Sequence, residues 1–167
     1  GVVASLSLRV LRADPPGGAR RWDRTNHAGR AVTLLEGPAY AVGAAAAAGL
    51  AGAGPAPVLA ATASAGLGAL DDLAGDSSSK GLKGHLGALA RGQVTTGAVK
   101  VLGLGLTGLA TAALVDRDRR HAAGGGRRDG APTVVDTLIG GAVVAGSANL
   151  LNLLDLRPGR ALKATVL

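Results

Sequence analysis

The feature that most constrains this chain is a stretch without a charged residue, from Gly37 to Leu70. It consists mainly of Ala, Gly, Leu and Val, and it ends at two adjacent aspartates, Asp71 and Asp72. A helix that crosses a bilayer needs about 20 mostly apolar residues, so this stretch has room for two short spans. Two carboxylates at the end of such helices are costly unless a cation uses them, and we take the pair as the main clue to function.

Composition favours a membrane protein over an ordinary soluble domain. Hydrophobic residues make up 47% of the chain, yet Trp22 and Tyr40 are its only aromatic residues, and Phe, Met and Cys are absent. A soluble core of such small side chains would be poorly specified, whereas membrane helices associate by close backbone approach at Gly, Ala, Ser and Thr. We therefore expect the 28 glycines to serve as helix-packing surface.

The net charge of +7 would suit nucleic acid or an anionic membrane surface. No aromatic residues alternate with the basic ones to stack on bases, and no nucleic-acid-binding module is recognisable, so we expect no nucleic-acid partner. The lack of cysteine excludes disulfides and Cys-type zinc sites.

The sequence predicts an all-α, polytopic membrane fold in a single domain, residues 1–167, with antiparallel neighbouring helices. Residues 1–11 resemble the end of a first helix, and a Gly-Pro break at residues 54–57 separates the first two complete spans. The complete spans are predicted at residues 37–53, 56–70, 95–115 and 132–151.

The loops between these spans differ in charge. Alternate threading places residues 12–36, 71–94 and 152–163 on one side and residues 116–131 on the other. The first three loops hold most of the Lys and Arg, so the positive-inside rule makes them cytoplasmic. We interpret residues 116–131, which contain Asp116, as a solvated, flexible loop.

One glycine-rich run, GLGLTG at residues 103–108, superficially resembles a phosphate-binding loop. It lies inside an apolar span and lacks the Gly-Lys-Ser/Thr that such a loop needs. We interpret it as a helix-packing face. No dinucleotide or P-loop signature occurs in the chain.

Asp71 and Asp72, with Asp76 nearby, open a polar stretch on the predicted cytoplasmic side. Carboxylate oxygens suit Mg²⁺, which takes one or two protein carboxylates and completes its shell with water and phosphate oxygens. Lys80 and Lys83 could neutralise phosphate. The alternative is that the two aspartates merely end a helix at the membrane interface.

A second polar group ends the last predicted span, in the sequence NLLNLLD. On a helix, Asn149, Asn152 and Asp155 fall within a sector of about 120° and share one face. That face is expected at the same depth as the aspartate pair. Polar residues at membrane depth are functional by default, and the alternative is hydrogen bonding between helices.

Two further sets of residues could bind phosphate. Arg24, Asn26, His27 and Arg30 lie in the first polar loop, where a solvated basic loop explains them nearly as well. Lys100 lies about one turn inside the span 95–115, where it can either extend outward to the interface or point at the aspartates.

The order of these motifs resembles the polyprenyl-phosphate N-acetylhexosamine-1-phosphate transferase superfamily, glycosyltransferase family 4. The chain has a DRxNHxGR-like first loop, a DD pair followed by KGLKG, a GxxK that opens the next span and an N-x-x-N-x-x-D that ends the one after. That superfamily includes the phospho-N-acetylmuramoyl-pentapeptide transferase of peptidoglycan synthesis and related N-acetylglucosamine-1-phosphate transferases.

The resemblance implies a multi-pass enzyme of the bacterial plasma membrane. It would transfer a sugar 1-phosphate from a UDP-amino sugar to a polyprenyl phosphate and release UMP, with Mg²⁺ or Mn²⁺, in cell-envelope glycan synthesis. It also implies a homodimer. By the same resemblance Asp71, Asp72 and Asp155 are catalytic and metal-binding, and the substrates are bound by Asn149, Asn152, Lys80, Lys83, Lys100, Asn26, His27 and Arg30.

Two departures from the family pattern leave alternatives open. The segment DLRPGRALK at residues 155–163 stands where the family has a Gly-Leu-Asp-Gly-Leu run, and a later aspartate and histidine of the family would lie beyond Leu167. We therefore expect the N-terminal part of a longer enzyme, with an active site incomplete in this chain. The alternatives are a non-catalytic homologue that acts as a scaffold in cell-envelope assembly, and a soluble Ala/Gly-rich helical bundle.

Overall fold

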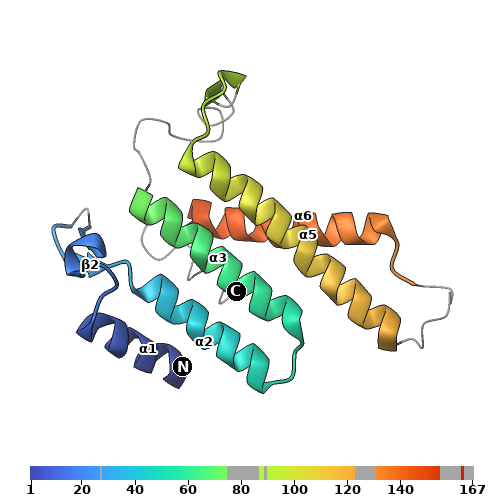
Figure 1. Cartoon of the computed structure of the whole chain (residues 1–167), viewed down its shortest axis with the longest axis horizontal. Coiled ribbons are helices and arrows are strands. Elements are labelled where there is room, and N and C mark those ends of the chain that lie inside the picture. Colours follow the sequence, from blue (N-terminus) through green and yellow to red (C-terminus); the bar gives the residue numbers. More distant parts are fainter. Residues whose placement is uncertain (27, 75–86, 89, 123–130, 155–162, 164–167) are drawn as a thin grey trace. The chain divides into compact units, whose positions relative to one another are not determined.

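The chain forms two compact units, Gly1–Leu102 and Gly103–Leu167. The computed structural model describes residues 1–26, 28–74, 87–88, 90–122, 131–154 and 163 (Figure 1). Its main elements are α1 (Val2–Ala13), the 3₁₀ turn η1 (Ala19–Arg21), β1 (Asp23–Thr25), β2 (Ala31–Thr33), α2 (Glu36–Leu50), α3 (Pro55–Ala74), α5 (Thr96–Ala122) and α6 (Val134–Leu154). The predicted all-α class is confirmed, apart from one short hairpin.

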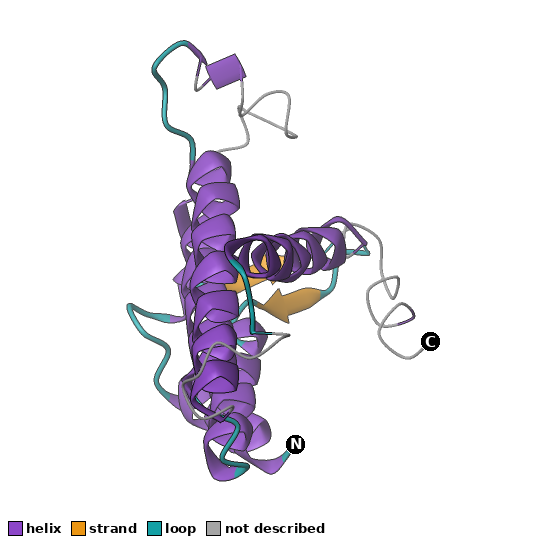
Figure 2. Ribbon diagram, turned by 90° about the vertical axis from the view of Figure 1, so that its right-hand side faces the viewer, coloured by secondary structure: helices purple, strands orange, loops and turns teal. Residues whose placement is uncertain are grey.

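The hairpin of β1 and β2 lies in the first polar loop, where the sequence predicted no strands (Figure 2). Its antiparallel register pairs Asp23 with Thr33, Arg24 with Val32 and Thr25 with Ala31. Asn26 shapes the turn, because its Oδ1 accepts hydrogen bonds from the amides of Ala28 (2.9 Å) and Arg30 (3.0 Å). Gly29 has a φ of 73°, a conformation that favours glycine.

Trp22, the only tryptophan, anchors this hairpin to the chain before it. Its ring is buried and its Nε1 donates to the carbonyl of Pro16 at 2.8 Å. The amide of Leu34 donates to the carbonyl of Trp22 at 2.8 Å and so continues the pairing beyond β2. A buried indole with a satisfied N–H fixes the local chain path.

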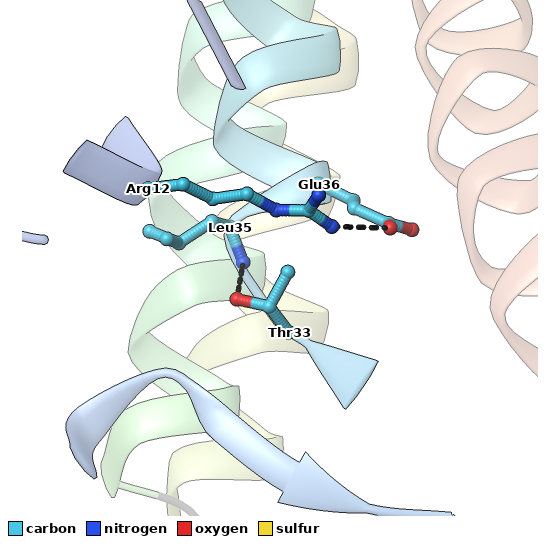
Figure 3. A network of polar contacts seen from close by, with 4 residues as sticks. All are labelled: Arg12, Thr33, Leu35 and Glu36. Atoms are coloured by element: carbon cyan, nitrogen blue, oxygen red, sulfur yellow. Dashed lines mark hydrogen bonds and ion pairs between the residues drawn. The ribbon is translucent and has the colours of Figure 1, made fainter. Parts of the chain in front are cut away.

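A polar network joins the end of α1 to the start of α2 (Figure 3). Arg12 lies 3.5 Å from Glu36, and the amide of Leu35 donates to the Thr33 hydroxyl at 3.3 Å. The two charged side chains are 55% and 69% exposed, so this ion pair contributes little to stability. The buried Leu35 side chain is the firmer anchor.

In the first unit α2 packs against both α1 and α3 (Figure 1). The contact with α1 is close at Gly43, where an added Cβ would lie 2.7 Å from the Cβ of Ala4. The predicted break between helices is confirmed: α2 ends at Leu50 and α3 begins at Pro55, a residue suited to the first turn of a helix.

The end of α3 differs from the prediction. The span was expected to stop at Leu70, with a loop from Asp71, but the helix continues to Ala74. Asp71 and Asp72 therefore lie within the last described turn of α3 and not in a loop after it.

Among the residues that the structure describes, two helices are long and apolar enough to cross a membrane: α5, Thr96–Ala122, and the Val134–Leu151 part of α6. They correspond to the predicted spans 95–115 and 132–151. The 15 residues of α2 would extend only about 22 Å, less than the roughly 30 Å of a bilayer core. The four-span topology accordingly stays a prediction.

In the second unit α5 and α6 contact each other through glycine. A Cβ added to Gly108 would overlap the carbonyl oxygen of Gly141, and one added to Gly141 would lie 2.6 Å from Cδ2 of Leu109. Such close approach is typical of small-residue helix contacts. It confirms a helix-packing role for Gly108 of the GLGLTG run, whereas a Cβ added to Gly105 would meet nothing within 4 Å.

The predicted loop 116–131 is partly wrong, because α5 continues through Asp116 to Ala122. Asp116 is buried, and its Oδ2 accepts a hydrogen bond from the hydroxyl of Thr137 at 2.6 Å. A local excess of charge suggested a solvated loop, but a hydrogen-bond partner on α6 allows this carboxylate to be buried.

Candidate functional site

The candidate site is built around the last turns of α3, which carry Asp71 and Asp72. The carboxyl end of a helix carries a partial negative charge, so two carboxylates there are unfavourable unless cations compensate them. Two basic side chains from other elements of the first unit provide this compensation.

Lys100, near the start of α5, contacts the first of the two aspartates. Its Nζ donates to Oδ2 of Asp71 at 2.9 Å. The side chains are only 16% and 29% exposed, so the pair is screened less than a surface ion pair. Of the two orientations open to Lys100 from sequence, the one toward the aspartates is confirmed.

Arg24, on β1, contacts the second aspartate through the main chain. Its Nη2 donates to the carbonyl oxygen of Asp72 at 3.4 Å, while its Nη1 donates to the carbonyls of Arg21 (3.0 Å) and Asp23 (2.8 Å). The last four carbonyls of a helix have no partner within it, and Asp72 supplies one of them. Arg24 thus caps the end of α3 from a different element.

Sequence reasoning placed Arg24 among possible phosphate ligands of the first loop and missed this contact. The available signal was indirect: a helix that ends in acidic residues has carbonyls and charges that a basic side chain can satisfy. Several arginines in that loop met the same description, so composition did not distinguish Arg24.

Asp72 is exposed as a residue, although its carboxyl group is partly buried, and its side chain has no hydrogen bond or ion pair within the described part of the chain. Partial burial raises its pKa above the ordinary value of 3.8. The charge of Lys100 opposes that rise, the charge of Asp71 adds to it, and Arg24 opposes it. Asp72 is the member of the pair that is open to a ligand.

The first-loop residues of the predicted site have mixed outcomes. Asn26 uses its side-chain oxygen to hold the hairpin turn, and Arg30 is exposed beside it. His27 lies outside the described residues, as do Lys80 and Lys83. Their proposed contacts with phosphate stay predictions.

The polar face of α6 belongs to the second unit. Asn149 donates from Nδ2 to the carbonyl of Ala145 on its own helix at 3.0 Å, and Asn152 also lies within α6. Asp155 lies outside the described residues. The approach of this face to Asp71 and Asp72 stays a prediction.

A divalent cation would find one or two carboxylates at this site. No group of three or more His, Cys, Asp or Glu side chains suited to a metal occurs among the residues that the structure describes. Mg²⁺ needs no such group, because it usually keeps several waters and binds one or two protein carboxylates together with substrate phosphates. Asp72, with Asp71 beside it, fits that donor set.

In the part of the chain that the structure describes, the fold and the site define a mainly helical protein with two helices long and apolar enough to cross a membrane, and with an acidic pair flanked by a lysine and an arginine. The chain matches no protein-family model, no curated protein and no solved structure.

Proposed function

We propose that this protein is a membrane phosphoglycosyl transferase. It moves a sugar 1-phosphate from a UDP-N-acetylamino sugar to a polyprenyl phosphate and releases UMP, in bacterial cell-envelope glycan synthesis. The observation that carries the proposal is the meeting of Asp71, Asp72, Lys100 and Arg24 from three separate elements. The order of motifs along the sequence supports it.

This arrangement suits phosphoryl transfer, in which a protein mainly positions the reactants and neutralises charge. Lys100 forms an ion pair with Asp71, whereas Asp72 is an exposed residue without such a partner in the described part of the chain. Mg²⁺ held by these carboxylates would supply positive charge for the phosphates, and Mn²⁺ would serve in its place. Lys80, Lys83 and Arg30 would add positive charge from the loops.

A membrane location suits the lipid substrate, because a polyprenyl chain needs apolar surroundings while its phosphate needs a polar edge. The apolar helices α5 and α6 support this part of the proposal. The proposed topology adds residues 37–53 and 56–70, in the region of α2 and α3, as a second pair of spans, with the loops 12–36, 71–94 and 152–163 in the cytoplasm. It further includes a homodimer and roles for Asn149, Asn152 and Asp155 in holding the nucleotide and the metal.

The test measures UMP release by membranes that contain the protein. They receive polyprenyl phosphate, Mg²⁺ and either UDP-N-acetylglucosamine or UDP-N-acetylmuramoyl-pentapeptide. Asp72→Asn should abolish release, because the amide replaces an anionic oxygen ligand, and Asp14→Asn, at an exposed aspartate remote in sequence, should leave it unchanged. EDTA should stop the reaction, and added Mg²⁺ or Mn²⁺ should restore it.

Full turnover by Asp72→Asn would contradict the proposed site. Absence of UMP release with every donor, in protein that remains folded in the membrane, would favour the non-catalytic scaffold.

A further inference from the structure

Arg24 joins two elements that lie far apart in the sequence. We propose that Arg24 is a positioning residue: it holds the β1–β2 hairpin against the carboxyl end of α3 and fixes the main chain that carries Asp72. The docking of the hairpin is inferred from the hydrogen bond between Arg24 and the Asp72 carbonyl. Its effect on catalysis rests on the proposed function.

Main-chain carbonyls next to Arg24 in the sequence orient its guanidinium toward α3. Nη1 donates to the carbonyls of Arg21 and Asp23, which leaves Nη2 directed at the carbonyl of Asp72. A planar guanidinium fork can serve acceptors on two elements at once, whereas the compact ammonium of lysine cannot span them in the same way.

The hairpin gives this contact a firm base. Trp22, two residues before Arg24, is buried and donates to the carbonyl of Pro16, and Asn26 closes the turn through two amides. Because these contacts already order the hairpin, its docking on α3 restricts mainly the side chain of Arg24. The hydrogen bond of Arg24 to Asp72 therefore connects the end of α3, through the hairpin and Trp22, to the segment that contains Pro16.

Charge favours the docked arrangement. Asp71 and Asp72 add two negative charges to the negative end of α3, and Lys100 and Arg24 bring two positive ones. Removal of Arg24 would leave an excess negative charge and one fewer donor for the terminal carbonyls of α3. The hairpin would then lose its described hydrogen bond to Asp72.

The chain is well suited to a direct test of docking, because it has one tryptophan and no cysteine. Leu73→Cys, at a residue that is 40% exposed, accepts a bimane label beside Asp72, and Trp22 acts as the quencher. Arg24→Gln in this background should lower the quenching at least two-fold. Arg20→Gln removes a neighbouring exposed arginine and should leave the quenching unchanged. Equal quenching in Arg24→Gln and its parent overturns the docking.

Kinetics of UMP release separate positioning from substrate binding. Arg24→Gln should lower kcat about 10- to 100-fold while KM for both substrates stays within two-fold, because misplacement of a catalytic group acts on the chemical step. Arg24→Lys keeps the charge but loses the fork, so it should recover neither the quenching nor more than a small part of kcat. A rise in KM alone, or full recovery by Arg24→Lys, overturns the positioning role.

The two readouts fail independently. If no variant releases UMP, the proposed function fails, and the fluorescence of Leu73→Cys still decides whether Arg24 docks the hairpin. If UMP release is normal in Arg24→Gln, the positioning role fails while the proposed function stands.

Discussion

At the scale of single residues, two adjacent aspartates have different environments. Successive residues of an α-helix point about 100° apart, so Asp71 and Asp72 present their carboxylates to different neighbours. Asp71 contacts Lys100 of α5, whereas Asp72 is exposed and contacts Arg24 only through its carbonyl. The sequence shows a symmetrical DD pair, and the fold makes it asymmetric.

The ion pair of Lys100 and Asp71 should contribute measurably to stability. Lys100→Met leaves a half-buried carboxylate without this partner, and hydrogen bonds to charged groups contribute about 1.5–3 kcal/mol. The free energy of unfolding, measured by denaturant titration in detergent, should fall by about that amount. Lys163→Met, at an exposed lysine, is the matched control and should change it little. Equal losses in both variants would contradict the assignment.

The raised pKa of Asp72 predicts a pH dependence. The folded protein holds this proton more tightly than the unfolded chain, so stability is greatest below the unfolded value of 3.8 and falls as pH rises through the folded pKa. Asp72→Asn removes the charged form, and its Tm should exceed that of the parent at pH 7. The advantage should vanish below pH 3.8. A lower Tm of Asp72→Asn at pH 7 argues against the raised pKa.

At the scale of elements, the closest contacts between helices occur at glycines, which have no side chain to keep the backbones apart. Gly43 allows α1 to approach α2, and Gly108 with Gly141 does the same for α5 and α6. The hairpin follows a different rule: its strands are too short to show an alternating pattern, and Asn26 and Trp22 hold it through hydrogen bonds.

The contact of α5 with α6 can be tested at one position. Gly141→Val would place atoms within 3 Å of Leu109 and force the helices apart, and such overpacking typically costs about 1–3 kcal/mol. Gly146→Val lies on the same helix, where an added Cβ meets nothing within 4 Å. Thermal unfolding in detergent should therefore show a larger loss for Gly141→Val. Similar losses would mean that helix propensity, not the contact, is responsible.

At the scale of the whole molecule, the apolar exterior of the long helices is the dominant feature. In α6, Val135, Leu138, Ile139 and Val143 are exposed, a pattern that water disfavours and lipid tolerates. The same residues would be a liability in a soluble bundle.

This exterior predicts how the protein fractionates. It should stay with membranes through washes in high salt and alkaline carbonate, and pass into solution only with detergent, because apolar burial in lipid does not depend on ionic strength. Fractionation followed by immunoblotting checks this. Release by salt alone would instead favour the soluble helical bundle.

The sequence by itself determined the helical class, the break before Pro55, the two long apolar helices and the role of Gly108 in packing. These features follow from local composition, because helix formation and apolar length depend on neighbouring residues. Only the tertiary structure decided that α3 continues past Asp71 and Asp72 and that basic residues 29 and 48 positions away contact them. Many of the lysines and arginines in the chain could pair with the carboxylates and terminal carbonyls of α3, and long-range packing determines which ones do.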